Sequence, residues 1–357
     1  MHTVLLTGGL GYIGSHIAIE LLNSDYEYNV IIIDNLSNSH IDKLEIIKKN
    51  VKNKNFRSDL SIFEKKEIKI EDTKYLHFIE MDLLNYDDLD NLFKNYKIDI
   101  VIHLAGLKSV GDSILDPLNY YHNNLLTTIN LLNIMKKHDC KNIIFSSSAT
   151  VYGSLQAPYT ENMEIGIGLT NPYGKTKYMQ EEFLRDVYKS DNRWNIIILR
   201  YFNPISQKNL ELKEIPNGVP NNLFPYIIKV YNEELPLLQV YGNTYNTIDG
   251  TCVRDFIHVV DLANGHVKAC LFIINNKTSN KTSNKTSIKT YNLGTGKGIS
   301  VKQLIDKFEE INNTKINYKY TSKREGDLDI SYADSSLAEK ELGWKTIYDI
   351  DNMVKIL

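Results

Sequence analysis

The chain has 357 residues, of which 41 are lysine or arginine and 44 are aspartate or glutamate, and its formal net charge at pH 7 is −3. Charges of both signs are intermixed and no candidate helix carries a basic stripe, which argues against a nucleic-acid-binding surface. No apolar stretch approaches the roughly 20 residues that span a bilayer and the N-terminus shows no secretory leader, so we expect a soluble, cytoplasmic protein.

Short apolar runs alternate with helical patterns over the first two hundred residues, as in a parallel sheet that is covered by helices on both faces. The runs are rich in β-branched residues, which is typical of strands buried on both sides. The predicted strands are Thr3–Thr7, Val30–Asp34, Leu76–Glu80, Ile100–Leu104, Asn142–Ser146 and Ile196–Arg200. The predicted helices include Gly14–Asn23, Leu118–Lys137 and Pro172–Lys189. The fold class is therefore α/β, a doubly wound, Rossmann-like parallel sheet.

The regular alternation ends after Arg200, where proline, glycine and asparagine become frequent. A length of 357 residues also favours two lobes around one cleft. We predict a cofactor-binding domain over residues 1–200 and a smaller mixed α/β substrate lobe over residues 201–357, with some segments returning to the first domain. Two polar segments, Lys49–Thr73 and the NKTS repeats from Asn276, are interpreted as surface insertions.

The three cysteines are far apart in the sequence, at positions 140, 252 and 270. They form no C-x-x-C pair and have no nearby histidine of the kind that completes a metal site. We therefore predict reduced, partly buried thiols and no bound metal.

A glycine-rich loop, TGGLGYIGSH, places Gly8, Gly11 and Gly14 directly after the first predicted strand and at the start of a helix. This context is the one in which glycines permit a tight turn, close approach of a pyrophosphate, and close helix packing. Asp34 ends the second strand, where a carboxylate accepts hydrogen bonds from the ribose of NAD and repels the 2′-phosphate of NADP. The pattern therefore predicts an NAD site.

A second group consists of Ser148, Tyr173 and Lys177, in the segments SSSATVYG and NPYGKTK. A spacing of four places Tyr173 and Lys177 on one face of a helix. An ammonium about 4 Å from a phenol stabilises the phenolate by an energy of the order needed to lower its pKa from about 10 towards neutrality, and an oxidised nicotinamide would add to that effect. Tyr173 is therefore a candidate base for a sugar hydroxyl, with Ser148 holding the same oxygen.

These motifs and several others in the same order resemble the extended short-chain dehydrogenase/reductase family, and within it the UDP-glucose 4-epimerases, over nearly the whole chain. The further matching segments include VIHLAGLKSVGDS, LRYFNP, GVPNNLFPYI, DGTCVRDFIHVVDLANGH, YNLGTG and REGDL. The resemblance implies an NAD-dependent isomerase that takes UDP-hexose substrates. Family members commonly form homodimers through the helices that correspond to Leu118–Lys137 and Pro172–Lys189.

The resemblance also implies contacts with NAD, with Asp82 lying against the adenine and Phe202 bordering the nicotinamide. The expected cofactor contacts are Gly8, Gly11, Tyr12, Ile13, Gly14, Asp34, Asn35, Asn38, Ser39, Asp82, Leu83, Ala105, Lys108, Asn123, Ser148, Tyr173, Lys177 and Phe202. No metal contact is expected.

For the UDP-sugar, the resemblance implies that Gln239–Tyr241 meets the uracil, that Arg254 and Arg324 clamp the diphosphate, and that Asp327 holds the ribose. The expected substrate contacts are Lys108, Ser148, Tyr173, Asn203, Asn222, Leu223, Gln239, Val240, Tyr241, Arg254, Arg324, Asp327 and Ser331. A tyrosine at the position of Ser331 narrows the sugar pocket in some relatives. The small serine therefore predicts that UDP-N-acetylglucosamine and UDP-N-acetylgalactosamine are also accepted.

The chemistry agrees with this interpretation, because carbon 4 of a hexose bears no acidic hydrogen and its inversion needs temporary oxidation to a ketone. A sugar 4,6-dehydratase of the same fold would need an Asp-Glu pair where this chain has Ala149 and Thr150. A non-catalytic NAD-sensing protein would have lost the Tyr173 and Lys177 pair. A decarboxylating or reducing relative stays open, and net change in free NADH during turnover would reveal it.

Overall fold

The computed structural model describes residues 1–52, 57–60, 75–208, 212, 214, 220, 222–278, 287–324 and 326–356, with backbone alone at 57–60, 277 and 278. Most of the polar segment Lys49–Thr73 and of the NKTS repeats lies outside the described residues. Of the two segments that were predicted to be surface insertions, the structure therefore describes only residues 49–52, 57–60, 276–278 and 287.

A central sheet of eight parallel strands runs through the described part of the chain, in the order β12-β7-β6-β5-β1-β2-β4-β3. The strands are β1 (His2–Thr7), β2 (Tyr28–Asp34), β3 (Arg57–Leu60), β4 (Tyr75–Glu80), β5 (Ile100–His103), β6 (Asn142–Ser148), β7 (Asn195–Tyr201) and β12 (Ile288–Leu293). All six predicted strands are present, with ends that differ by one or two residues. The doubly wound α/β fold class is confirmed.

The two strands that were not predicted are the edge strands β3 and β12. Strand β3 lies within the polar segment interpreted as an insertion, and it extends the sheet beyond β4 with Arg57 opposite Tyr75. Strand β12 pairs with β7 from Ile288 opposite Ile196 onwards. An edge strand has only one neighbour and tolerates polar residues, so neither segment carries the continuous apolar run of a central strand.

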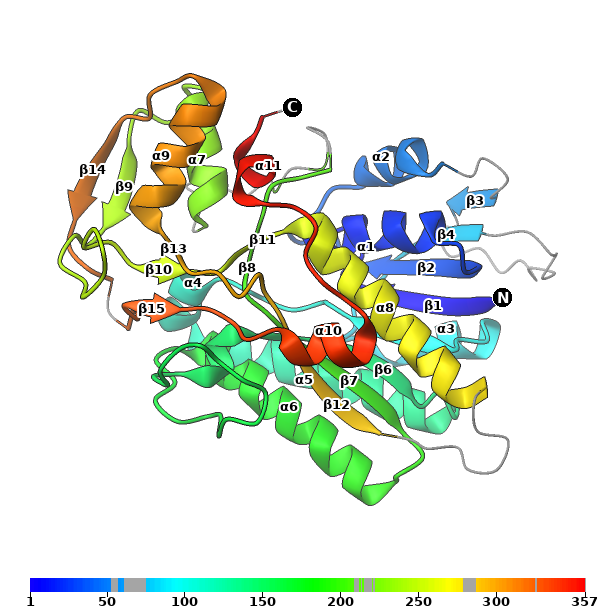
Figure 1. The fold of residues 1–357 in the computed structure, drawn as a ribbon. Helices are drawn as coiled ribbons and strands as arrows, with labels where there is room; N and C mark the ends of the chain where they lie inside the picture. Colours follow the sequence, from blue (N-terminus) through cyan, green and yellow to red (C-terminus); the bar gives the residue numbers. More distant parts are fainter. Residues whose placement is uncertain are drawn as a thin grey trace.

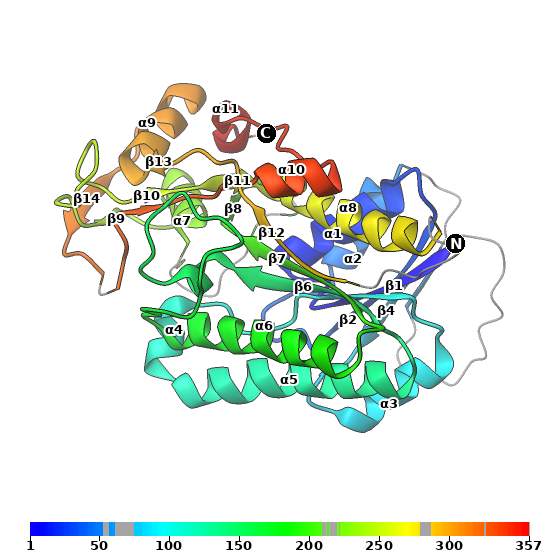
Figure 2. The same ribbon diagram turned by 60° about the horizontal axis from the view of Figure 1, so that its bottom comes forward.

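Helices cover both faces of the sheet, as Figures 1 and 2 show. One face carries α1 (Tyr12–Asn23), α2 (Lys43–Asn50) and α8 (Val259–Thr278), and the other carries α3 (Tyr86–Asn95), α5 (Pro117–Lys137) and α6 (Pro172–Ser190). The starts of α5 and α6 are fixed locally, because each has a proline at its first position. The side chains of Asp116 and Asn171 each accept a hydrogen bond from a backbone N–H in the first turn.

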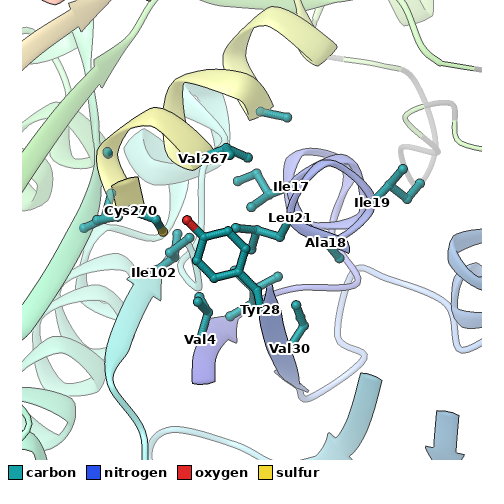
Figure 3. Packing of buried hydrophobic residues seen from close by; sticks show 14 of the residues in the cluster. Val4, Ile17, Ala18, Ile19, Leu21, Tyr28, Val30, Ile102, Val267 and Cys270 are labelled. Carbon is teal, nitrogen blue, oxygen red and sulfur yellow. The ribbon is translucent and has the colours of Figure 1, made fainter. Parts of the chain in front are cut away.

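Apolar side chains between α1, α8 and the sheet form one large core, part of which is shown in Figure 3. The ring of Tyr28 on β2 lies there among Ile17 and Leu21 of α1 and Val267 and Cys270 of α8. A second core fills the other face, between the sheet and α3, α5 and α6. The two cores hold the carboxyl ends of the central strands in fixed relative positions.

The second lobe consists of small sheets and helices that lie beyond the carboxyl ends of the large sheet (Figure 1). Its elements are β8 (Asn203–Ile205), α7 (Leu223–Tyr231), β9 (Leu238–Tyr241), β10 (Val253–Arg254), β11 (Phe256–His258), β13 (Ile299–Ser300), α9 (Val301–Asn312), β14 (Tyr318–Thr321), β15 (Ile330–Ser331) and α11 (Ile350–Val354). Its core joins Phe224 and Ile227 of α7, Phe308 of α9 and Val354 of α11.

Three further elements complete the described chain: α4 (Val110–Leu115), a 3₁₀ turn (Ala149–Tyr152) and α10 (Ser336–Leu342), which packs on α8 and β12. The cysteines at positions 140, 252 and 270 are not in disulfides and are buried, whereas the sequence predicted reduced, partly buried thiols. Within the described ranges, no helix has the length and apolar character needed to cross a bilayer.

Candidate active site

The predicted site residues gather where the parallel strands end. Because β1, β2, β5, β6 and β7 all point the same way, their carboxyl ends meet at the edge of the sheet that faces the second lobe (Figure 1). Gly8, Asp34, Ala105, Ser148 and Phe202 lie at or directly after these five ends. In open α/β sheets this edge is where ligands bind.

The loop after β1 turns at Gly8, whose φ of +67° lies in the left-handed region that favours glycine. A Cβ atom at Gly14 would lie 2.6 Å from the Gly9 Cα atom and from the Gly8 carbonyl oxygen, so a larger residue would push α1 off the loop. Helix α1 starts after Gly11, and no side chain caps its first N–H groups. Such an uncapped N-terminus fits the diphosphate of a dinucleotide.

Asp34 is buried at the end of β2 and connects this loop to the next one. Its carboxylate accepts hydrogen bonds from the backbone N–H groups of Leu10 and Leu36, both at 3.0 Å, and from the Ser39 hydroxyl at 2.8 Å. Three of about four acceptor sites are therefore used, which leaves room for one further donor such as a ribose hydroxyl. The carboxylate that was expected to select the cofactor thus also orders the glycine loop.

Of the residues that were expected on the adenosine side of the cofactor, Asn35 and Asp82 are in contact. The Asn35 side-chain amide donates to the Asp82 carboxylate at 3.0 Å, and Leu83 beside it is buried. Asn38 is exposed. At the end of β5, the Ala105 N–H donates to the Thr7 hydroxyl, and Ala105 lies so close to Gly8 that a Cβ there would be 2.9 Å from the Ala105 Cα atom.

Lys108 and Asn222 come together through Glu214, a residue that sequence reasoning missed. The Lys108 ammonium forms a salt bridge with the Glu214 carboxylate, and the Asn222 amide donates to both carboxylate oxygens at 3.1 Å. Leu223 follows as the first residue of α7. Glu214 lies in a segment with no helix or strand pattern, so no local signal pointed to it.

Lys43 is a second missed residue, buried at the start of α2 on the side that faces Asp34, Glu214 and Lys108. Burial, followed by the charge of Lys108, lowers the pKa of its ammonium to about 8. It lies in a short helix rich in charged residues, where nothing in the sequence distinguishes it from a surface lysine. Asn123, which was expected to contact the cofactor, is half-buried, while the adjacent Asn124 is fully buried and bonds both backbone groups of Leu107.

Tyr173 and Lys177 lie one turn apart on α6, opposite Ser148 at the end of β6. The Lys177 ammonium donates to the Ser146 carbonyl at 2.7 Å and lies 4.8 Å from the centre of the Phe145 ring. Burial lowers the pKa of Lys177 to about 7, and the Glu181 carboxylate opposes this change. The amine therefore titrates in the physiological range.

Tyr173 is half-buried, and desolvation of its phenol raises the pKa to about 12, while a hydrogen bond with Ser148 opposes the rise. The protein's own groups thus hold this phenol neutral at pH 7. The expected lowering of its pKa needs more positive charge beside it than the described side chains provide. Ser148 and Tyr173 lie close enough together to share one ligand oxygen.

On the second lobe, the residues expected to bind a nucleotide-sugar come from separate segments of the chain. Arg254 is fixed by the carbonyl groups of Val253 and Leu328 at 2.9 and 2.8 Å and by Asp327 at 3.4 Å. Strand β10 pairs in parallel with β15, which places Arg254 opposite Ser331. The Arg324 guanidinium lies 3.8 Å from the centre of the Tyr241 ring on β9, a cation–π contact.

The two lobes meet at Phe202 and Asn203, directly after β7. Phe202 is buried against the Tyr159 ring, and the Asn203 N–H donates to the Asp255 carbonyl of the second lobe at 2.9 Å. Gln239 and Val240 precede Tyr241 on β9, which pairs with β14. Across the described ranges, no group of three or more histidine, cysteine, aspartate or glutamate side chains is arranged to hold a metal ion.

Comparisons with known proteins agree with this geometry. The sequence pattern of the family described as GDP-mannose 4,6 dehydratase matches residues 5–357. The chain is 45% identical over 352 residues to the UDP-glucose 4-epimerase of Bacillus subtilis (strain 168), covering 98% of this chain and 94% of that protein. It is 43% identical over 360 residues to that of Mus musculus, covering 100% and 96%.

Solved structures give the same result. The UDP-glucose 4-epimerase from Bifidobacterium longum, in complex with NAD+ and UDP, superposes with a TM-score of 0.85 at 44% identity, covering 99% of this chain and 96% of that one. The Stenotrophomonas maltophila enzyme, with bound NAD and formylated UDP-arabinopyranose, superposes with a TM-score of 0.87 at 37% identity, covering the same shares.

Proposed function

Because the chain belongs to the UDP-glucose 4-epimerase family of extended short-chain dehydrogenases/reductases, we propose that it interconverts UDP-glucose and UDP-galactose through a 4-keto sugar. The observation that carries the proposal is the pairing of Tyr173 and Ser148 at the carboxyl edge of the sheet, opposite a lobe that presents Arg254. One side holds an acid–base pair, and the other holds a binding group for an anionic nucleotide.

The cofactor is NAD, which supplies the reversible acceptor for the two electrons that leave carbon 4. The residues present fit it. Gly8 and Gly14 leave no space for a side chain where the diphosphate would lie against α1. Asp34 keeps one acceptor site for a ribose hydroxyl, and its charge disfavours the 2′-phosphate of NADP.

In the reaction, Tyr173 takes the proton of the sugar 4-hydroxyl and Ser148 donates a hydrogen bond to the same oxygen. Tyr173 needs a lowered pKa for this role, although burial raises it in the protein alone. The positive charge of the bound oxidised cofactor and that of Lys177 act in the required direction. Tyr173 returns the proton after the ketone has turned over in the pocket.

The substrate is held mainly at its nucleotide end. Arg254 and Arg324 bind the diphosphate, since planar guanidinium groups pair bidentately with phosphate oxygens. Asp327 binds the ribose, and Gln239 to Tyr241 lie along the uracil. Firm anchoring there with few rigid contacts to the hexose lets the 4-keto sugar rotate and present its opposite face.

Dehydration is the rival chemistry, and the matching family pattern carries the name of a dehydratase. Elimination of water needs an acid beside the sugar, but the two positions after Ser148 are Ala149 and Thr150. Neither side chain is a carboxylic acid, so the chain lacks the group that would protonate the leaving hydroxyl. Epimerisation fits the residues present.

Two finer features belong to the same proposal. The small Ser331 beside Arg254 leaves space for a 2-acetamido group, so N-acetylated UDP-hexoses are also substrates. The chain forms a homodimer through α5 and α6. Leu118 in the first turn of α5 and Leu115 at the end of the preceding α4 are strongly exposed apolar residues, as expected for an interface.

The decisive experiment is to denature the purified protein and measure released NAD, and then to assay UDP-galactose conversion without added cofactor. The proposal expects NAD to be released and conversion to proceed with no net formation of free NADH. Accumulation of free NADH, or formation of a dehydrated sugar, would overturn it.

A further inference from the structure

Three contacts join the end of β6 to one face of α6. Residues 173, 177 and 181 recur every four positions on this helix, and 146 to 148 end the strand. Tyr173 bonds the Ser148 hydroxyl, and Lys177 donates to the Ser146 carbonyl at 2.7 Å. The third contact uses a residue with no assigned role, because the Ser147 hydroxyl donates to the Glu181 carboxylate at 2.5 Å.

Glu181 is completely buried, and its carboxylate is also held by Arg200 of the adjacent strand β7. The two side chains form a bidentate pair, with nitrogen–oxygen distances of 3.0 and 2.8 Å. Arg185 adds a longer contact of 3.2 Å from the solvent side. Arg200 in turn donates to the Tyr152 hydroxyl at 2.9 Å. The Glu181 carboxylate thus links α6, β6 and β7, one to two helical turns after the candidate catalytic residues of α6.

We propose that Glu181 is a positioning residue that fixes Ser148 against Tyr173 and favours the protonated form of the Lys177 amine. This inference rests on the proposed epimerase function. Glu181 fixes the register because Ser147, its partner, is the residue between the two that contact Tyr173 and Lys177. It acts on the charge of Lys177 because it is the ionic group one turn further along the same buried helix face.

The groups around Lys177 leave Glu181 as its main electrostatic partner. The titratable and charged side chains that face this region are Tyr173 and Glu181 on α6, His103 on β5, Arg200 and Tyr201 on β7, and Tyr120 on α5. Burial lowers the pKa of His103 to about 3 and raises the pKa of Tyr201, so both are neutral at pH 7. Arg200 is positive and pairs with Glu181, so among the described side chains Glu181 is the negative charge near Lys177 that can favour the ammonium form.

A buried ion pair can also serve stability alone, so the test needs readouts that stability does not move. Two variants separate the two roles. Glu181→Gln removes the negative charge and keeps the size of the side chain. Ser147→Ala removes only the hydrogen bond between β6 and Glu181 and leaves the ion pair of Glu181 with Arg200. Glu182→Gln is the matched control, because it removes a half-exposed carboxylate one residue along the same helix.

The pKa of Lys177 is measured by nuclear magnetic resonance of the ¹³C-lysine-labelled protein, with the signal assigned by its loss in Lys177→Ala. In Glu181→Gln we expect this pKa to fall by about one unit or more. The alkaline limb of the kcat–pH profile should move down by the same amount, with the KM for UDP-galactose little changed. Glu182→Gln should match the parent in both measurements.

Ser147→Ala should lower kcat by about tenfold through misplacement of Ser148, without a change in the pKa of Lys177. If Glu181→Gln folds and shows the parent's Lys177 pKa and pH profile, Glu181 does not favour the protonated form of Lys177. If that variant does not fold, Glu181→Asp replaces it, and loss of the Lys177 ammonium despite the retained charge would be contrary evidence. An unchanged kcat in Ser147→Ala overturns the positioning role.

A parent protein that lacks epimerase activity would refute the proposed function instead. The Lys177 titration would still test the charge role in that case, because it does not depend on turnover. The two failures are therefore distinguishable.

Discussion

Lys177 donates its hydrogen bond to the main-chain carbonyl of Ser146, in the same strand that ends at Ser148. A main-chain acceptor cannot lose this role by mutation or titration, so the amine keeps one position whatever its protonation state. Burial lowers the pKa of the amine to about 7 and raises that of the neighbouring phenol, Tyr173, to about 12. The two groups are thus held together while their proton affinities depend strongly on added charge.

The first prediction concerns Tyr173. Replacing it by phenylalanine removes the hydroxyl and keeps the ring, so NAD content and UDP-sugar binding should stay near those of the parent. Turnover of UDP-galactose should fall by roughly 10²–10⁴-fold, the usual contribution of a positioned acid–base group. Near-normal turnover in Tyr173→Phe would show that another group moves the proton.

The second prediction concerns Lys177→Ala. An ammonium stabilises a nearby phenolate, so its removal raises the pKa of Tyr173 in the complex. The acid limb of the kcat–pH profile should therefore move to higher pH, with lower activity at pH 7. If the profile of this variant has the parent's limbs and only its height differs, the amine does not set the pKa of the base.

Much of the fold could be predicted because each central strand has a recognisable apolar pattern in its own sequence. The run VIII in β2, from Val30 to Ile33, is apolar at every position because both of its faces are buried. The strand β12, IKTYNL, carries polar residues at an edge and returns to the sheet only after the chain has built part of the second lobe. The position of β12 in the sheet depends on the path of the chain through the second lobe, and a local sequence pattern does not reveal that path.

The site divides in the same way. Tyr173 and Lys177 are visible in the sequence because their chemistry needs a helical spacing of four. Glu181 continues that spacing, but its role depends on Ser147 and Arg200, which reach it from two other elements. Glu214 meets Lys108 across more than one hundred residues, and nothing in its own segment marks it.

The third prediction concerns Gly14. A Cβ there would lie 2.6 Å from backbone atoms of the glycine loop, which cannot rotate away as a side chain can. Gly14→Ala should therefore lower the free energy of unfolding by about 1–3 kcal/mol and reduce the NAD that copurifies. Gly111→Ala is the control, because its Cβ would meet no atom within 4 Å. Equal effects of the two substitutions would mean that helical glycine propensity, not close packing, matters.

The fourth prediction concerns acid stability and rests on four buried histidines. Burial is the largest cause that lowers the pKa of His16 and His103 to about 3 and of His258 and His266 to about 4. Unfolded histidine has a pKa of about 6.5, so between these values the unfolded chain binds more protons than the folded one. The stabilisation is therefore complete above pH 6.5 and is lost as the pH falls towards 4.

At pH 5 each of these histidines should lower the free energy of unfolding of the protein by about 2 kcal/mol relative to neutral pH. Urea unfolding followed by tryptophan fluorescence at pH 7 and pH 5 measures the sum. His266→Gln keeps an acceptor for the Tyr201 hydroxyl and removes one titrating group, so its pH dependence should be weaker by one histidine's share. Equal stability of the parent at both pH values would contradict the argument.

The last prediction concerns which sugars enter, and the structure bears on the main objection to it. Ser331 lies opposite Arg254 in the β10–β15 pair, and its hydroxyl faces the buried phenol of Tyr159, whose pKa is raised by burial and lowered by this contact. The objection is that the adjacent Tyr332 could fill the space that the small serine leaves.

Tyr332 follows the last residue of β15, however, and a Cβ at Gly298 would lie 3.3 Å from its ring. That ring therefore packs against Gly298, whereas Ser331 is the residue paired with Arg254. The parent should convert UDP-N-acetylgalactosamine as well as UDP-galactose. Ser331→Tyr should keep UDP-galactose conversion and lose the N-acetylated substrate, because overlap in a close-packed pocket is costly. A parent that converts UDP-galactose well but neither N-acetylated sugar would show that some other residue closes the pocket.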